Sequence, residues 1–348
     1  MKQNHSKPEP DNLESRELLP IGEVSLLTGV NAVTLRAWQR RFGLVIPART
    51  PKGHRLYTPE NIQQIHEINA WLAKGVAISK VKPLLMSSAL VTEVDCTPLQ
   101  ESDLWLEQIT ALNSALFELD QHKLHQILDE ALGLYPFQLV KQQLLLAWIT
   151  QLTPLLEPRL DAELLLAWLE SELASRTGGR ASFAGQASLA QIGLVQLPST
   201  LGQKTAEQFS GHSSMFNSSM TNRLYSLVLR LELAELRVSV VNLGVLDTDS
   251  LGLINNRLKV DALLLLPEAN HPASKQTELQ SVLEQMAQAC YLIGPFAPTL
   301  TALSGFMAPE LSELIGQLTA AKEQQKKRQR NQKNSTAELV QGEQVYER

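Results

Sequence analysis

The spacing of hydrophobic positions changes along the chain, and each change marks a boundary between regions. Between residues 103 and 176, apolar side chains recur every three or four positions, the period of an amphipathic α-helix. From residue 190 onward, short apolar runs alternate with helical stretches, which is typical of an α/β domain with a parallel sheet. The pattern predicts strands at 192–198, 237–244, 261–267 and 290–296, and helices at 219–235, 249–258, 276–289 and 309–325.

The helical region is expected to contain four helices joined by short turns, with breaks near Pro154 and Pro158. Such a pattern favours a four-helix bundle. A Gly/Ser-rich stretch at 176–188 predicts the boundary with the α/β domain, which is expected to be Rossmann-like.

The remaining segments lack a hydrophobic period. Residues 1–17 are polar and contain prolines, so we expect a disordered leader. Residues 87–102 read as a linker, and residues 322–348 as a charged, Gln-rich tail. The sequence therefore predicts a multidomain protein with folded domains at 18–86, 103–176 and 189–321.

Composition narrows the class of protein. The 348 residues are 44% hydrophobic and 19% charged, as in ordinary globular proteins. No apolar run approaches the roughly 20 residues that span a bilayer, and the N-terminus has no apolar signal segment. The two cysteines, Cys96 and Cys290, cannot form a disulfide framework. These features predict a cytoplasmic protein with no membrane contact.

Charge is unevenly distributed. The whole chain carries −5, but residues 34–82 carry nine Lys/Arg against two acids, and residues 83–321 carry −13. A basic block inside an acidic chain indicates a polyanionic partner. A solvated basic surface would account for the same charges.

The basic block begins with two short predicted helices separated by a tight turn at 28–31. Asn31 is expected to cap the second helix, and Val33, Leu35 and Trp38 are expected to anchor it inward. The polar residues that would then project outward are Thr34, Arg36, Gln39, Arg40 and Arg41. This arrangement suits a helix-turn-helix, whose second helix enters the major groove of DNA, although an ordinary αα-hairpin has similar spacing.

The next stretch cannot be helical, because Pro47, Pro51 and Gly53 interrupt it. Short extended pieces around a basic turn predict a hairpin wing that contacts phosphates. Its candidate contact residues are Arg49, Lys52, His54, Arg55 and Tyr57. Thr58 as cap and Pro59 in the first turn predict the start of another helix.

At these residues the chain resembles a known family. IGEVSLLTGVNAVTLRAWQRRFGL followed by RTPKGHRLYTPENI is similar to the all-α winged helix-turn-helix domain of MerR-family transcription regulators. The resemblance covers residues 18–86, and the joint spacing of its motifs is highly specific. The layout of the whole chain resembles the branch of this family that adds a helical bundle and a cobalamin-binding Rossmann-like fold.

The resemblance implies a sequence-specific regulator of transcription and not an enzyme. In this family, a dimer binds a palindromic promoter, and many members activate transcription through DNA shape. Double-stranded promoter DNA, RNA polymerase and a second copy of the chain are thus the implied partners, with a signalling protein as a further candidate. In smaller members of the family, a long helix after the winged domain mediates dimerisation. Pro83 is expected to end that helix here, so dimerisation would depend on the later domains.

The resemblance does not extend to the cofactor motif. Cobalamin-binding members carry a His-x-x-Gly motif after the first strand, and here the matching positions fall near Met220 and Arg223. The nearby His212 is followed by Ser-Ser-Met, so we expect no cofactor. A cobalamin- or light-responsive repressor is the alternative, since a corrinoid that supplies its own base needs no protein histidine.

Other chemistry has little support. His122, His125 and Asp129 could form a metal-binding face on one helix, but ordinary surface polarity explains them as well. No nucleotide-binding glycine motif and no catalytic Ser/His/Asp or Cys/His set is evident, so neither a catalytic residue nor a metal is predicted.

Overall fold

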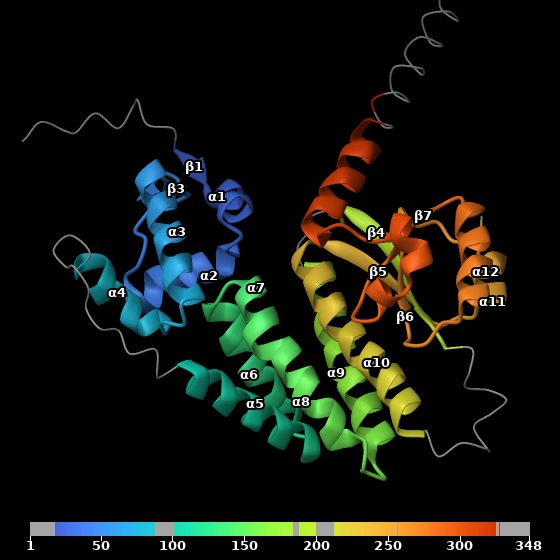
Figure 1. Cartoon of the computed structure of the whole chain (residues 1–348). Helices are drawn as coiled ribbons and strands as arrows, with labels where there is room; N and C mark the ends of the chain where they lie inside the picture. Colours follow the sequence, from blue (N-terminus) through green and yellow to red (C-terminus); the bar gives the residue numbers. More distant parts are fainter. Residues whose placement is uncertain are drawn as a thin grey trace, which may run out of the picture. The chain divides into compact units, whose positions relative to one another are not determined.

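The computed structural model describes residues 18–87, 101–183, 188–199, 212–255, 257–324 and 327 (Figure 1). It divides into two compact units, residues 1–147 and 148–348, which we call unit 1 and unit 2. The expected leader, most of the expected linker and most of the expected tail lie outside the described residues. Among the helices described, none has the length and hydropathy needed to cross a bilayer.

Unit 1 begins with a small winged helical domain. Its helices are α1 (Ile21–Thr28), α2 (Ala32–Ala37), the π-helical η2 (Trp38–Phe42), α3 (Pro59–Ala73) and α4 (Ile78–Ser87). Its strands β1 (Leu19–Pro20), β2 (Ala48–Arg49) and β3 (Arg55–Tyr57) form an antiparallel sheet in the order β1-β3-β2. Trp38, Ile65, Ile68 and Leu72 are almost fully buried and form its core. The expected helix pair, wing and third helix are all present.

The expectation that Pro83 ends the helix is wrong. It lies inside α4, which continues to Ser87. A proline in a helix removes one backbone donor and disturbs one turn. Because Ile78 and Val81 are buried on the turn before it, packing holds this short helix in place.

The rest of unit 1 is helical and contains α5 (Glu101–Phe117), α6 (Gln121–Leu134), α7 (Phe137–Val140) and the π-helical η3 (Lys141–Leu146). Asp120 caps α6 by accepting a hydrogen bond of 2.9 Å from the Lys123 backbone. The rings of Trp105 and Tyr135 meet edge-on at 5.0 Å. Buried leucines recur along α5 and α6 at helical spacing, as the hydrophobic pattern predicts.

Unit 2 includes α8 (Ala147–Leu156) and α9 (Ala162–Phe183). Two expectations about this region need correction. Pro154 lies inside α8, and the chain leaves the helix only at 157–161. The Gly/Ser-rich stretch after 176 does not end α9, which continues to Phe183. Four helical stretches are thus present between 101 and 183, and their packing as one bundle remains a prediction.

The C-terminal part of unit 2 is an α/β domain. Its parallel sheet has the order β5-β4-β6-β7, with β4 (Ala190–Leu197), β5 (Val238–Val245), β6 (Ala262–Pro267) and β7 (Ala289–Leu292). The helices between the strands are α10 (His212–Glu235), α11 (Thr248–Leu253) and α12 (Ala273–Glu284), and a last helix spans 311–324. All four expected strands are confirmed within a few residues, whereas the helix expected at 249–258 ends at Leu253.

Both faces of this sheet are covered, as its apolar central strands require. Leu264 and Leu266 of β6 pack with residues of α10 and the last helix, such as Leu229 and Leu314. Leu263 and Leu265 of the same strand pack on the opposite side with residues of α11 and α12. Successive leucines of β6 thus point to opposite faces of the sheet, and each face packs against its own layer of helices.

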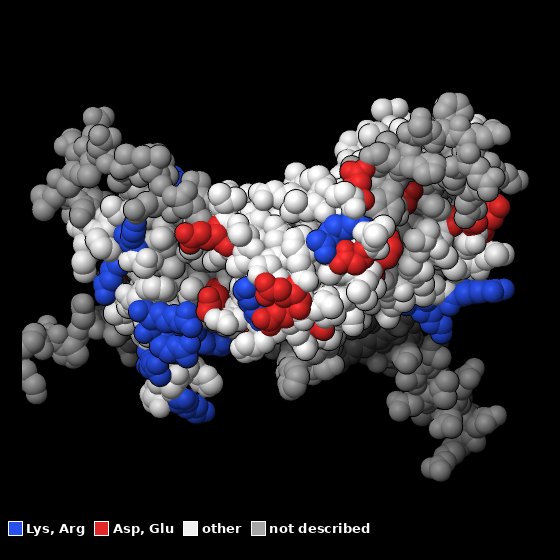
Figure 2. All heavy atoms as spheres, turned by 90° about the horizontal axis from the view of Figure 1, so that it is seen from below, with Lys and Arg blue, Asp and Glu red and all other residues white. Residues whose placement is uncertain are grey.

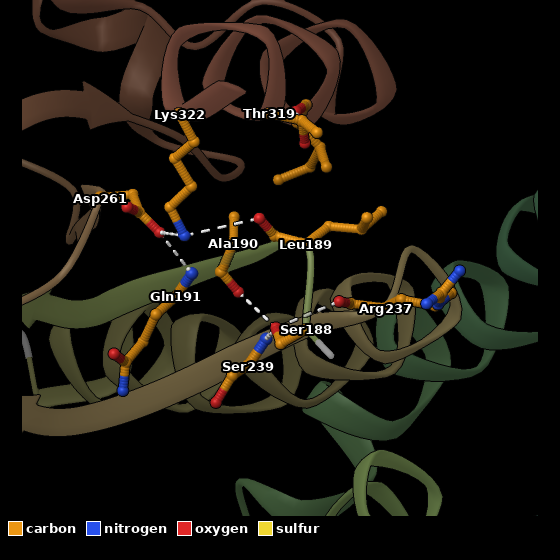
Figure 3. Close-up of polar contacts among 10 residues, drawn as sticks. Ser188, Leu189, Ala190, Gln191, Arg237, Ser239, Asp261, Thr319 and Lys322 are labelled. Atoms are coloured by element: carbon orange, nitrogen blue, oxygen red, sulfur yellow. Dashed lines mark hydrogen bonds and ion pairs between the residues drawn. The ribbon is translucent and has the colours of Figure 1, made fainter. Parts of the chain in front are cut away.

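The last helix is also tied to the amino end of the sheet, as Figure 3 shows. Lys322 Nζ lies 2.6 Å from a carboxylate oxygen of Asp261, and that same oxygen accepts a 2.7 Å bond from the Gln191 backbone. Ser188 Oγ accepts from the Ser239 backbone at 3.0 Å. These contacts fix the strand ends from which β4, β5 and β6 begin.

Candidate nucleic-acid interface

The second helix of the pair is held by both of its ends. Gly29 ends α1 in a left-handed conformation, with φ of 69°, which favours glycine. The side chain of Asn31 then accepts a 2.9 Å hydrogen bond from the Val33 backbone, as the sequence predicts. Gly43 closes the helical segment at the end of η2, again with positive φ.

Inward anchors and outward arginines alternate around this helix. Leu35 and Trp38 are almost fully buried, as expected. Val33 is 58% exposed, so its expected role as an anchor is wrong. Arg36, Arg40 and Arg41 are exposed, as the spacing predicts.

The wing extends the same basic surface. Between β2 and β3, the Thr50 backbone donates to His54 at 2.9 Å, and Gly53 adopts a φ of 83° at the turn. Arg55 donates from Nε to Gln39 at 3.0 Å and so ties the wing to the second helix. Of the candidate contact residues of the wing, Arg49, Lys52 and His54 are exposed.

The basic side chains of the two elements lie together. An open cavity of about 880 Å³ in unit 1 is lined by Arg36, Arg40 and Arg41 from the helix and by Arg49 and Arg55 from the wing. In Figure 2 the largest group of Lys and Arg side chains forms a patch with Asp and Glu side chains beside it, and smaller groups of Lys and Arg lie elsewhere on the same face. With the described residues, Arg36, Arg40, Arg41 and Arg49 form no ion pair. A surface of this kind attracts phosphate groups.

Two of the expected contact residues are not on this surface. Thr34 has no exposed area, and Tyr57 is 1% exposed within the core of the winged domain. Burial raises the pKa of the Tyr57 phenol, while the charges of Arg55 and Arg36 act in the opposite direction. In this structure both side chains are buried, whereas the helical spacing predicts that Thr34 projects outward and the wing pattern predicts a DNA contact at Tyr57.

Sequence reasoning missed the other wall of the cavity. This wall is formed by one face of α6, which includes His122, His125, Asp129 and Glu130. These residues lie about ninety positions from α2 in the sequence, so no local pattern connects them. Within the described parts of the chain, no group of three His, Cys, Asp or Glu side chains is arranged to hold a metal ion.

The residues of the α/β domain do not fit imidazole ligation of cobalamin at the expected position. Met220, which stands where the histidine is expected, is a buried residue inside α10. Arg223 stands near the expected glycine and pairs with Glu163 at 2.6 Å and Glu170 at 2.9 Å, two residues of α9. Both positions lie inside α10 and serve helix packing, so neither offers an imidazole to a corrin ring.

Comparison with known proteins identifies the winged domain. Residues 19–88 match the family described as MerR HTH family regulatory protein. They form a MerR-type helix-turn-helix domain. The chain is also 42% identical over 121 residues to the HTH-type transcriptional regulator MlrA of Salmonella typhimurium, a match covering 35% of this chain and 46% of that protein.

A second regulator and one solved structure were also found. The HTH-type transcriptional repressor CarH of Myxococcus xanthus is 34% identical over 119 residues, which cover 32% of this chain and 38% of CarH. The chain thus spans less than half the length of either regulator. The methanol:cobalamin methyltransferase complex MtaBC from Methanosarcina barkeri aligns with 71% of this chain and 89% of its own, at 14% identity. Its TM-score of 0.26 gives no support to a shared fold.

Proposed function

We propose that this chain is a transcription regulator that binds promoter DNA through its MerR-type domain. The observation that carries the proposal is the set of exposed arginines that α2, η2 and the wing bring to one surface. An α-helix fits the major groove, and an arginine can donate two hydrogen bonds to guanine there. The relatives MlrA and CarH are named as transcriptional regulators, which supports a regulatory and not an enzymatic role.

We assign base contacts to Arg36 and Arg40 and phosphate contacts to the wing. The remaining proposed contacts are Gln39, Arg41, Arg49, Lys52, His54 and Arg55. Thr34 and Tyr57 are buried in the arrangement that the structure describes, so no contact is assigned to them there.

The rest of the proposal concerns how the regulator acts. A dimer would bind a palindromic promoter in the cytoplasm and activate transcription together with RNA polymerase, and unit 2 would receive the signal from a partner protein. The resemblance to MerR-family regulators supports dimerisation and activation. One relative is named a repressor, so activation is tested directly. A reporter gene fused to the target promoter should be expressed at a lower level when the gene for this protein is deleted.

The experiment that tests DNA binding begins by selecting target duplexes from a random library with the full-length protein. Arg36→Ala should then weaken binding to the selected duplex by about 1–3 kcal/mol, or roughly 5- to 150-fold. Fluorescence anisotropy measures the affinity, and circular dichroism checks that the variant is folded.

The matched control is Arg257→Ala, which removes one exposed arginine of unit 2 and should leave the affinity unchanged. Equal binding by the wild type and Arg36→Ala would refute the assigned contact. If no duplex is enriched over the starting library, the proposed function is wrong.

A further inference from the structure

The carboxyl end of α6 is docked on the helix that carries the arginines. Thr34 Oγ1 lies 3.5 Å from the carbonyl oxygen of Leu132, and Trp38 Nε1 donates to the carbonyl oxygen of Leu134 at 2.8 Å. The last four carbonyl groups of a helix have no partner within that helix. Two side chains of the helix-turn-helix thus satisfy the free end of α6.

This contact accounts for the burial of Thr34. The hydroxyl group lies on the side of α2 that faces α6, and the residue has no exposed area. In the sequence, Thr34 is one of the polar positions expected to project outward. It is therefore a polar residue of the second helix that another part of unit 1 covers.

The charges across the cavity have opposite signs. Asp129 and Glu130 are exposed on α6 and line the same cavity as Arg36, Arg40 and Arg41. Two carboxylates beside the arginines attract them and repel the phosphates of a DNA backbone. Acidic side chains on this wall are therefore poorly suited to a surface that stays open to DNA.

The dimensions lead to the same conclusion. A major groove about 12 Å wide receives one α-helix, whose diameter with side chains is about 10–12 Å. Two packed helices have axes about 8–10 Å apart, so a groove that receives α2 has no room for α6 docked beside it. The cavity of about 880 Å³ has the size of a small-molecule site and cannot contain a duplex.

We propose that α6 is an intramolecular cover of the DNA-binding surface, and that DNA binds after α6 has separated from α2. This inference rests on the proposed function and adds its regulation. The affinity for DNA is then reduced by the fraction of molecules that are open, so any partner that draws α6 away raises it. The acidic face of α6 competes with phosphate for the same arginines.

A reversible disulfide tests the cover. Thr34→Cys and Gly133→Cys place two thiols near the contact, because Gly133 directly follows Leu132, whose carbonyl oxygen lies 3.5 Å from Thr34 Oγ1. A Cβ added at Gly133 meets no atom within 4 Å, so a side chain has room there, and the two helix ends must approach slightly for the disulfide to close. Cys96→Ser and Cys290→Ala remove the native thiols. We expect the oxidised protein to bind the selected duplex at least about tenfold more weakly than the same protein after reduction. The two single-cysteine variants, treated with the same oxidant, are the controls.

Either of two results would overturn the cover. If the disulfide forms and the oxidised protein still binds DNA as tightly as the reduced protein, α6 does not block the surface. If the thiol of the Thr34→Cys single variant reacts with a maleimide as fast as an exposed cysteine does, the docked arrangement is not populated in solution, because Thr34 has no exposed area in it. Failure of the parent protein to bind any selected duplex is a separate result and counts against the proposed function itself.

A charge variant tests the same inference without touching α2. Asp129→Asn with Glu130→Gln should raise the affinity several-fold, because it removes two negative charges from the α6 wall of the cavity that the arginines also line. Glu107→Gln with Glu118→Gln makes the same change in net charge at two exposed positions outside this cavity, one in α5 and one directly after it. An equal gain in the two double variants would show a general charge effect and would overturn the cover.

Discussion

At the scale of single residues, the clearest electrostatic consequence of the fold lies at His271, in the loop after β6. Burial lowers the pKa of its imidazole, and an interaction with the Leu197 backbone opposes that shift. Its Nε2 atom is buried without a hydrogen-bond partner in the described part of the chain. The folded state therefore favours the neutral ring, since a protonated ring would place charge on a buried atom.

This gives a prediction for the pH dependence of stability. Because the pKa of His271 is lower in the folded state, both states are neutral well above the unfolded pKa of about 6.5, and the residue has no effect on stability there. As the pH falls below that value, the unfolded state binds the proton first and stability decreases. The loss in melting temperature between about pH 7.5 and 5.5 should thus be smaller in His271→Gln than in the wild type.

His54→Gln, at an exposed position of the wing, is the control for this measurement and should follow the wild-type pH profile. A His271→Gln protein that loses as much stability as the wild type over this pH range would show that the ring is not held neutral.

The positions of candidate contact residues could be predicted only where local spacing decides them. Arg36, Arg40 and Arg41 are exposed as the helical period requires. Thr34 is on the same helix, but its burial depends on α6, about one hundred residues further along the chain. A single sequence contains no local signal for such a contact.

At the scale of elements, α3 shows how closely a sequence can define a helix start. Thr58 accepts a hydrogen bond from the Asn61 backbone, and the Asn61 side chain accepts one from the Thr58 backbone, both at 3.2 Å. Pro59 occupies the first turn, where a missing N–H costs nothing. This reciprocal arrangement fixes where α3 begins. The buried face of α3 then supports the wing.

Thr58→Ala should therefore destabilise the winged domain by about 1 kcal/mol, because it removes the side-chain acceptor of the cap. Urea unfolding of the full chain, followed by circular dichroism, measures the change. Thr110→Ala, inside α5, is the matched control and should be neutral or slightly stabilising, since alanine is the better helix former. Equal effects of the two substitutions would contradict a special role for the cap.

Breaks in helices were harder to predict than their beginnings. Pro83, Pro154, Gly178 and Gly179 all lie inside helices, although each is a typical signal for an end. A proline or glycine costs one hydrogen bond or some chain entropy, and burial of neighbouring leucines can outweigh that cost. The strands of the α/β domain were predictable because their apolar runs are short and lie between turn residues.

At the scale of the whole molecule, the separation of charge matters more than its sum. The net charge of −5 would repel DNA, but residues 34–82 carry +7 and their arginines share one surface. In the proposed function, attraction to DNA therefore depends on this local surface, while the acidic remainder of the chain weakens non-specific association. The sequence predicts this separation, whereas the strand order β5-β4-β6-β7 and the docking of α6 depend on tertiary contacts.

The salt dependence of DNA binding follows from this separation. Each phosphate that a protein neutralises releases condensed counterions, so the logarithm of affinity falls with the logarithm of salt concentration with a slope of about −0.9 per contact. Arg49→Ala removes one proposed phosphate contact from the wing and should make the slope shallower by about 1, with similar losses on different duplexes. Anisotropy titrations between about 50 and 200 mM salt measure the slopes of the wild type and the variant.

Lys259→Ala is the control, because it removes one exposed positive charge from unit 2 and so changes the net charge equally without altering the proposed surface. If the two variants shift the slope by the same amount, the charge of the whole chain governs binding, and the wing does not contact phosphate.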